Sequence, residues 1–385
     1  MLERFVSRMG KVIISGKQLC SLHTKSLKKS PNKENILIEE GSIAKYYHQY
    51  GICIFKPIID RLVITYNLED FSEDKREELI KYITVSFPQD GINDEAYKSV
   101  PKYLQGKYQF KAYKYNIWLK YKDQKKYILI QAVPLSPKAP FMRFDFYPAK
   151  LGKEGMEYFK KKLNEDFSLP DSQVYFDRIA EHEHAIQRID IAVDIAGVNV
   201  DDLSLDMLKG GEVYAAKSQV FVGLNGRNES IYPGFKNGKS NDLYVYNKKQ
   251  QQIDNNEKPT LGNINLTRIE RRVKKTKHSL YSIHKMQNHF KKINVRFIDY
   301  EPLKNKPYWH SMFIKIAKDT GLEKALGYIP ESEHSKYIES YSACFIDIWK
   351  PESLWDMLPS VIAEYGLVGA GLICTQVQAD ILNCT

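Results

Sequence analysis

A short segment of strict alternation constrains the fold of this chain more than any other feature of its sequence. From Arg188 to Ile195 the residues read RIDIAVDI, so branched apolar side chains alternate with charged or small ones. Successive side chains of a β-strand point to opposite faces. The segment therefore predicts a strand with one buried apolar face, and with Arg188, Asp190 and Asp194 on the other face.

The rest of the chain predicts strands in runs, with helices among and after them. Strands are expected at residues 60–66, 108–121, 126–133, 141–147, 188–195, 218–224, 230–235, 243–246 and 266–273. Helices are expected at residues 72–85, 152–167, 308–318, 332–340 and 353–364. Consecutive strands pair as antiparallel meanders, and strands followed by helices are typical of the α+β class. We therefore expect an α+β fold of antiparallel twisted sheets with packed helices, followed by a helical C-terminal domain.

Three consecutive parts are expected along the chain. Residues 1–56 are predicted to form a basic, partly disordered N-terminal arm, in which lysines surround the chain-breaking residues Ser30, Pro31 and Asn32. Residues 57–300 are predicted to form the α+β core, and residues 301–385 the helical domain. The arm is equally compatible with binding to DNA phosphates and with a solvated tail.

The charge balance favours a polyanionic partner. The chain has 385 residues, a formal net charge of +10 and a pI near 9.0. Nucleic acid is the first partner that such a charge suggests and an acidic membrane surface the second, although a basic soluble enzyme has the same balance. The 26 tyrosines suit stacking on unpaired bases, and they are also ordinary strand residues.

Cysteine usage and hydropathy indicate a cytoplasmic protein without a membrane span. The five cysteines are scattered, and no two have the C-x-x-C spacing. Neither a cysteine zinc site nor a disulfide framework is expected, which fits a reducing compartment. No segment is apolar for long enough to cross a membrane, so no membrane partner is expected.

The acidic face of the alternating segment is a candidate metal site. Asp190 and Asp194 share one face of the predicted strand, and like charges held close are costly unless a cation compensates them. Mg²⁺ or Mn²⁺ bound by carboxylate oxygens is one such cation. The alternative is structural: Arg188 neutralises Asp190, and Asp194 ends the strand.

The segment LYVYNKK, from Leu243 to Lys249, contains a candidate nucleophile. If a strand ends near Tyr246 and a helix begins, Lys249 lies one turn beyond the tyrosine. A phenol with an ordinary pKa near 10 is a weak nucleophile, and a nearby ammonium favours its anionic form. The alternative is a tyrosine-rich strand that is followed by a solvated lysine pair, Lys248 and Lys249.

The segment LTRIERRV, from Leu266 to Val273, places Arg268, Glu270 and Arg272 on one face. Glu270 is a candidate third metal ligand between phosphate-binding arginines, or one member of a surface ion-pair ladder. Basic residues of this segment, of the preceding LYVYNKK segment and of the stretch that follows are expected to bind DNA: Lys248, Arg268, Arg271, Arg272, Lys274, Lys275 and Lys277. No acidic residue occurs between Arg271 and Lys285 to pair with them.

A histidine pair, His182 and His184, could also hold a metal because both imidazoles would share one face of a strand. The surrounding residues are highly polar, which favours a solvated loop instead.

Three motifs, in this order, resemble the trans-acting replication initiation factor family, which includes rolling-circle plasmid initiators and related relaxases of conjugative elements. They are RIDIAVD (188–194), GFKNGKSNDLYVYNKKQ (234–250) and RIERRVKK (268–275). An opening strand, IDRLVITY (59–66), also fits, and the resemblance covers roughly residues 60–299. Gln250, Gln251 and Gln252 stand where the family has an acidic residue, which puts a ligand role for that stretch in doubt.

The resemblance implies a DNA strand-nicking endonuclease. A tyrosine of this family attacks one strand of a replication origin, becomes joined to the 5′-phosphate, and leaves a 3′-OH that primes rolling-circle replication. Tyr246 matches the nucleophile, and Asp190, Asp194 and Glu270 match a Mg²⁺ or Mn²⁺ site. The catalytic set is completed by Lys249 and Arg188, which with Arg268 are expected to hold phosphate oxygens.

The same resemblance implies DNA as the partner, as a replication origin with a single-stranded or hairpin nick site. It also implies a homodimer, and it makes a host helicase a candidate partner. Two alternatives stay open at this point. One is a conjugative relaxase with the same chemistry, and the other is a non-catalytic DNA-binding regulator in which the acids are ion pairs.

Overall fold

The computed structural model describes residues 11–15, 35–39, 42–67, 73–86, 97–99, 112–122, 125–166, 185–209, 212–213, 218–223, 226, 228–233 and 242–368. Antiparallel sheets and packed helices make up these residues, so the predicted α+β class is confirmed. No helix of this part of the chain is both long and apolar enough to cross a membrane.

The chain divides into two compact units, and each combines three stretches of sequence. Unit 1 comprises Met1–Lys56, Val193–Arg271 and Asn288–Leu354. Unit 2 comprises Pro57–Ala192, Arg272–Gln287 and Trp355–Thr385. This grouping by contact differs from the three consecutive parts expected from the sequence, whose boundaries stay a prediction.

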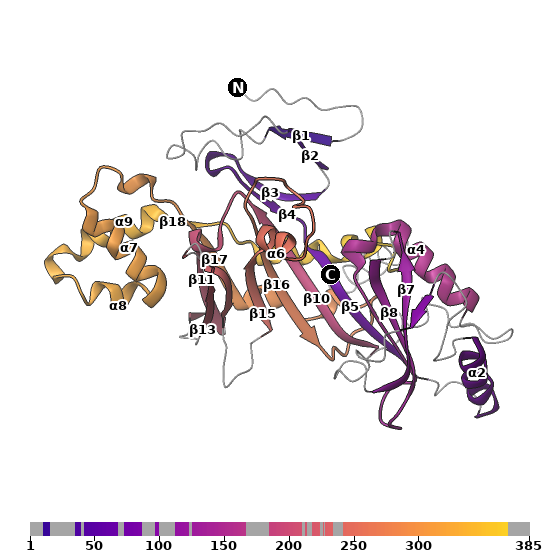
Figure 1. The fold of residues 1–385 in the computed structure, drawn as a ribbon. Helices are drawn as coiled ribbons and strands as arrows, with labels where there is room; N and C mark the ends of the chain where they lie inside the picture. Colours follow the sequence, from indigo (N-terminus) through magenta and orange to yellow (C-terminus); the bar gives the residue numbers. More distant parts are fainter. Residues whose placement is uncertain are drawn as a thin grey trace, which may run out of the picture. The chain divides into compact units, whose positions relative to one another are not determined.

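Unit 2 is built on an antiparallel sheet with the strand order β6-β7-β8-β9-β5-β10. Its strands are β5 (Ile58–Tyr66), β6 (Tyr97–Ser99), β7 (Tyr113–Tyr121), β8 (Lys125–Pro134), β9 (Met142–Phe146) and the first part of β10 (Ile186–Ala196). Its helices are α2 (Glu73–Ser86), α4 (Pro148–Asp166), the short η5 (Ile283–Lys285) and α11 (Leu358–Glu364). Figure 1 shows α4 lying along the strands of this sheet.

The core of unit 2 lies between α4 and one face of the sheet. Phe144 and Phe146 of β9 contact Phe159 of α4, with ring centroids 5.9 and 5.1 Å apart. Met156 and Leu163 complete the buried stripe of this helix at helical spacing. Because Phe144 and Phe146 alternate with Arg143 and Asp145, the polar side chains of β9 lie on the face away from α4.

Unit 1 contains the remaining strands, in three groups. The hairpin strands β1 (Lys11–Ser15) and β2 (Asn35–Glu39) pair with each other. The second group is β3 (Ile43–Tyr47), β4 (Ile52–Phe55), the end of β10, β13 (Ser218–Val222), β14 (Asn228–Pro233), β15 (Leu243–Asn247) and β16 (Leu266–Lys274), whose last three residues belong to unit 2. The third is a four-stranded sheet of β12 (Glu212–Val213), β11 (Leu203–Lys209), β17 (Ile293–Ile298) and β18 (Phe345–Asp347).

Regular structure begins earlier than the sequence indicated. The hairpin β3–β4, joined by the short helix η2 (His48–Tyr50), lies in the segment predicted as an arm, and Ile52, Cys53 and Ile54 in it are buried. Gly51 ends η2 in the left-handed conformation, which a glycine adopts without strain. Gly197, directly after β10, has φ +85°, and a Cβ added to it would lie 2.4 Å from the carbonyl oxygen of Gly51. The two backbones are therefore in close contact.

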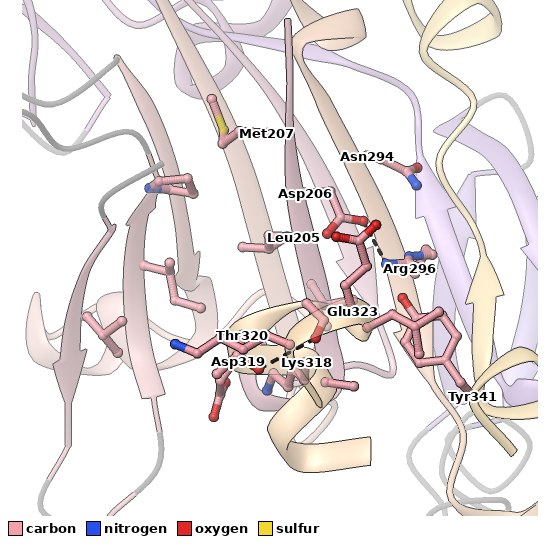
Figure 2. A pocket seen from close by; sticks show the side chains of 18 of the residues that line it. Leu205, Asp206, Met207, Asn294, Arg296, Lys318, Asp319, Thr320, Glu323 and Tyr341 are labelled. Carbon is pink, nitrogen blue, oxygen red and sulfur yellow. Dashed lines mark hydrogen bonds and ion pairs between the residues drawn. The ribbon is translucent and has the colours of Figure 1, made fainter. Parts of the chain in front are cut away.

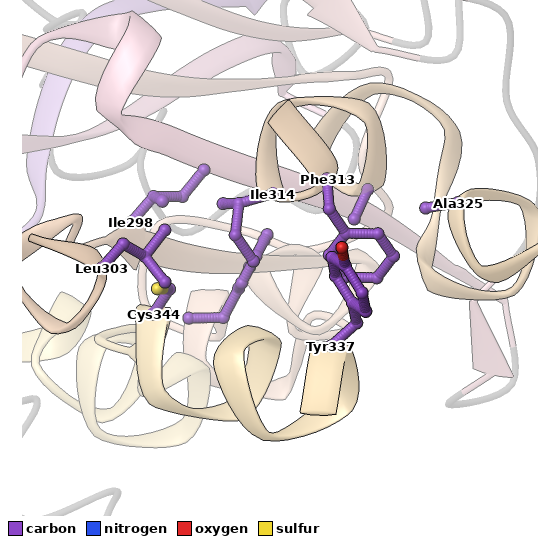
Figure 3. Packing of buried hydrophobic residues seen from close by; sticks show 9 residues of the cluster. Ile298, Leu303, Phe313, Ile314, Ala325, Tyr337 and Cys344 are labelled. Carbon is purple, nitrogen blue, oxygen red and sulfur yellow. The ribbon is translucent and has the colours of Figure 1, made fainter. Parts of the chain in front are cut away.

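The C-terminal helices are present close to the predicted positions, and the predicted helical domain of residues 301–385 stays a prediction. α7 (Tyr308–Thr320), α8 (Leu322–Leu326) and α9 (His334–Cys344) share a small core with Ile298 of β17 (Figure 3). β18 follows α9 directly and pairs with β17. Beyond α10 (Pro351–Asp356), α11 packs against β5 in unit 2. The other short elements are η4 (Val200–Asp202), α6 (Lys248–Asp254), η6 (His289–Lys292), η7 (Glu301–Leu303) and η8 (Glu331–Glu333).

Candidate functional site

Tyr246 lies on β15, where it is opposite Arg268 of the neighbouring strand β16. Its hydroxyl donates a hydrogen bond to Oε2 of Glu270 at 3.1 Å. Tyr246 is 9% exposed, and Glu270 is buried as well. The predicted nucleophile and one predicted acid are therefore in direct contact, with the carboxylate placed to accept the phenolic proton.

The predicted change from strand to helix directly after Tyr246 is confirmed. Asn247 caps the first turn of α6 with its side chain, and the helix begins at Lys248. The ammonium of Lys248 lies 5.9 Å from the centroid of the Tyr246 ring. The ammonium of Lys249 donates instead to the carbonyl oxygen of Asn263 at 2.8 Å. Lys248, rather than the expected Lys249, is thus the cation over the tyrosine ring.

Asp194 and Arg268 form a bidentate ion pair in unit 1. Nε and one Nη of Arg268 donate to the two carboxylate oxygens of Asp194 at 2.6 and 2.8 Å. Arg268 is almost fully buried, and a planar fork of this kind is the strongest arrangement of an arginine with a carboxylate. We call Tyr246, Glu270, Arg268, Asp194 and Lys248 the tyrosine site.

In unit 2, Asp190 is paired with arginines. Nε of Arg188 donates to Oδ1 of Asp190 at 2.8 Å, and Nε of Arg272 lies 3.4 Å from the same oxygen. The Asp190 side chain is 2% exposed, whereas both arginine side chains are 21% exposed. This is the geometry of the structural alternative, in which arginines neutralise the acid.

The arrangement does not present a ready-made carboxylate site for Mg²⁺ or Mn²⁺. Of the predicted ligands, Asp190 and Asp194 accept from arginines, and Glu270 accepts from Tyr246. Within the described ranges, no group of three or more His, Cys, Asp or Glu residues could hold a metal ion. The Mg²⁺ or Mn²⁺ site stays a prediction, and it requires at least one acid to exchange its present partner for the ion.

The predicted DNA-binding residues of β16 and beyond fall into two classes. Arg271 is 3% exposed and lies on the face of Ile269 and Val273, so as placed it is not available to a phosphate. The charge of Arg271 also acts on a histidine. Burial, and after it the charges of Lys292 and Arg271, lower the pKa of His289 to about 4.

By contrast, Lys274, Lys275 and Lys277 are exposed at and after the end of the strand. They are the exposed members of the predicted set.

Sequence reasoning missed a polar network on the face of unit 2 away from α4. Nε and one Nη of Arg61 on β5 donate to the two carboxylate oxygens of Asp145 at 2.7 and 2.6 Å. Arg143 donates to the same carboxylate at 2.9 Å, and it also donates to Gln131. In strand register Arg61 is directly opposite Asp190. The alternation in IDRLVITY and FMRFDFY was the signal that could have found it.

Sequence reasoning also missed a row of aromatic rings beside the tyrosine site. Tyr244 contacts Tyr232, and Tyr232 contacts Phe221, with ring centroids 5.1 Å apart in both pairs. We call Phe221, Tyr232 and Tyr244 the aromatic row. Its three members come from three neighbouring strands, so only the strand register could have brought them together.

Unit 1 also contains a cavity of about 1160 Å³, lined by β11, β14, β17 and the α7–α8 connection (Figure 2). Its charges balance: Arg296 pairs with Asp206 at 2.7 Å, and two lysines and two acids, Lys318, Lys324, Asp319 and Glu323, also line it. None of the residues predicted from the sequence lines it. The metal candidates His182 and His184 lie outside the described residues.

A scan of the chain against protein-family models and a search of curated proteins each gave no match.

Proposed function

We propose that this chain is a DNA strand-nicking replication initiator of the rolling-circle type, with Tyr246 as the nucleophile. The observation that carries the proposal is the hydrogen bond of 3.1 Å from the Tyr246 hydroxyl to Glu270. A tyrosine that attacks a phosphate has to lose its proton, and a buried carboxylate in direct contact is a suitable acceptor. The net charge of +10 suits a polyanionic substrate.

The reaction is a transesterification at phosphorus. The phenolic oxygen of Tyr246 attacks the scissile phosphate while its proton passes to Glu270. The bond from phosphorus to the 3′ oxygen breaks, a bond from phosphorus to tyrosine replaces it, and the departing oxygen takes up a proton. The products are a 5′-phosphotyrosine link and a free 3′-OH, and no oxidant or reductant is needed.

Two cations of the tyrosine site, Lys248 and Arg268, are 8% and 5% exposed, so they can stabilise the charge that develops on phosphorus once the site opens to the substrate. Lys248 lies over the tyrosine ring, and Arg268 is directly opposite Tyr246 in the sheet. Arg268 is held by Asp194, so its guanidinium is oriented before a substrate arrives. Cations fixed in advance stabilise a transition state more than mobile ones, because they need not reorganise during the reaction.

A conjugative relaxase with the same chemistry is compatible with the same geometry. A non-catalytic DNA-binding regulator is the second candidate. It is favoured by the ion pairs, since Asp190 and Asp194 both have arginine partners. In that protein Tyr246 and Glu270 would be a buried structural pair.

Covalent capture of DNA separates these candidates. The full chain is incubated with supercoiled plasmid that carries the DNA flanking its gene, with Mg²⁺ or Mn²⁺ and with EDTA in parallel. We expect nicked circles with protein attached, stable to detergent. Tyr246→Phe removes only the hydroxyl, so we expect adduct formation to fall at least about 1,000-fold while binding persists.

Tyr127→Phe in unit 2 is the matched control, since it removes a hydroxyl outside the tyrosine site, and it should nick normally. A mobility shift with intact supercoils would identify the regulator. Normal nicking by Tyr246→Phe together with loss of nicking by Tyr244→Phe would show that the neighbouring tyrosine is the nucleophile.

A further inference from the structure

The aromatic row lies on the same face of the sheet as Tyr246. Tyr244 and Tyr246 are two residues apart on β15 and so share a face. The pairing of Ser230 with Tyr246 places Tyr232 opposite Tyr244, and Phe221 is paired with Ser230. The row therefore runs from the strand of the nucleophile across β14 to β13.

The ring contacts fix the orientation of the row. Phe221 and Tyr232 meet edge to face at 65°, and Tyr232 and Tyr244 do so at 73°. Packing within the sheet accounts for Tyr232 and Tyr244, which are half-buried. It does not account for Phe221, which is 45% exposed at the end of the row.

β13 is the last strand of its sheet among the described residues, and it carries exposed apolar side chains in succession. Val220, Phe221 and Val222 are 44%, 45% and 59% exposed. Val220 lines the cavity of Figure 2, so Phe221, one residue later, points to the opposite face, toward the tyrosine site. Exposed apolar residues on an edge strand invite unwanted pairing, and their presence indicates a partner for this edge.

We infer that Phe221, Tyr232 and Tyr244 form a base-stacking track for the unpaired strand whose phosphate Tyr246 attacks. The inference rests on the proposed function. Aromatic rings bind single-stranded nucleic acid by stacking on successive bases, without regard to sequence. The track shares a face of the sheet with Tyr246. The cations of the tyrosine site, Lys248 and Arg268, are buried and would reach backbone phosphates once the site opens. The occupant of the track is thus single-stranded DNA with exposed bases, rather than a duplex.

Equilibrium binding of oligonucleotides with and without bases tests the track. The full chain carries Tyr246→Phe to prevent covalent capture, and two fluorescent 12-mers are compared: oligothymidine and a strand of equal length and charge with about six internal abasic sites. We expect Phe221→Ala to weaken binding of oligothymidine about 5- to 100-fold, the range for loss of one base–aromatic stack. Binding of the abasic strand should change less than about twofold.

Val220→Ala is the matched control, because it truncates an equally exposed side chain of the same strand that points to the other face. It should change neither affinity. Phe221→Tyr keeps a ring and should retain oligothymidine binding. Phe221→Leu keeps apolar volume without a ring, so it should lose the binding of oligothymidine. This variant replaces Phe221→Ala if the alanine variant does not fold.

Equal loss of affinity for both strands, or loss for neither, would overturn the track. So would a change in self-association of Phe221→Ala, measured by sedimentation, with unchanged oligonucleotide binding, since Phe221 would then belong to an interface between two copies. The nicking assay gives an independent result. Base-dependent binding without any covalent adduct would support the track and contradict the nuclease proposal. A covalent adduct without base-dependent binding would support the nuclease proposal and contradict the track.

Discussion

Each carboxylate of the predicted site has a specific partner, and the partners differ in what they allow. Glu270 accepts a hydrogen bond from the Tyr246 hydroxyl. Asp194 and Asp190 accept from guanidinium groups, so each forms an ion pair with an arginine. In the proposed reaction, Glu270 is therefore the proton acceptor, and the aspartates orient arginines.

Asp190→Asn tests this assignment at the level of one residue. The substitution keeps the shape of the side chain and removes its charge, so Arg188 and Arg272 lose their buried counter-ion. We expect the free energy of unfolding to fall by about 3 kcal/mol, as for other broken buried pairs. Urea denaturation measures the change.

Glu154→Gln is the control, because Glu154 pairs with Lys122 on the exposed surface at 2.7 Å and its loss should change stability little. If Asp190→Asn folds as stably as the wild type, and loses nicking that high Mn²⁺ restores, then Asp190 is a metal ligand rather than a structural acid.

The sequence indicates which side chains share a face of a strand, but it does not indicate which residues of other strands pair with them. Alternation correctly grouped Arg268 with Glu270 on one face of β16, and it placed Arg271 with Ile269 and Val273 on the other. The pairing of Asp194 with Arg268 joins residues 74 positions apart. Which arginine reaches which acid depends on strand register, and no local pattern encodes that register.

Among the elements, the close approach of two turns next to β4 and β10 depends on glycine. Gly197→Ala adds a Cβ that would lie 2.4 Å from the carbonyl oxygen of Gly51, at a φ of +85°. Backbone strain and the clash act together, so we expect a loss of about 3 kcal/mol in the free energy of unfolding. Thermal or urea unfolding of the purified variant measures it.

Gly226→Ala separates the two causes, since Gly226 has φ +73° and an added Cβ would meet nothing within 4 Å. It should cost about 1 kcal/mol from strain alone. Equal costs for the two variants would mean that the turns separate easily and that their contact contributes little.

Elements with strong local patterns were predicted well, and those that depend on distant pairing were not. The strand around Asp190 and the change from strand to helix after Tyr246 were both found. β11 and β17 were missed, although they pair along five residues each. Their sequences, LSLDMLK and INVRFI, are short, and each acquires its strand conformation from a partner about 90 residues away.

At the scale of the whole molecule, the basic charge predicts salt-sensitive binding to DNA. Lys274 and Lys275 are exposed at the end of β16. A phosphate contact releases about one counter-ion, so Lys274→Ala and Lys275→Ala should each reduce the slope of log affinity against log salt by about one unit or less. Titrations of origin and random duplexes at several salt concentrations measure this, and both duplexes should weaken alike.

Lys161→Ala is the control for the salt titration, since Lys161 is exposed on α4, outside the predicted DNA-binding set, with Glu165 at 3.6 Å. Its slope should equal that of the wild type. Unchanged slopes for Lys274→Ala and Lys275→Ala would identify the basic stretch as a solvated surface, and the DNA path would then be sought along the N-terminal segment.

The interleaving of early and late segments also determines how the chain can fold while it is being made. The hydroxyl of Tyr47 donates to the carbonyl oxygen of Ile348 at 3.1 Å, across 301 positions of sequence. In unit 2, α11 packs against β5, and these two elements are separated by almost as many positions of sequence as Tyr47 and Ile348. At about 5–20 residues per second, the first strands wait on the order of 15–60 seconds for these partners. We expect the nascent chain to bind chaperones that shield apolar strands, and neither unit to reach its native state until the segments around Ile348 and α11 have been synthesised.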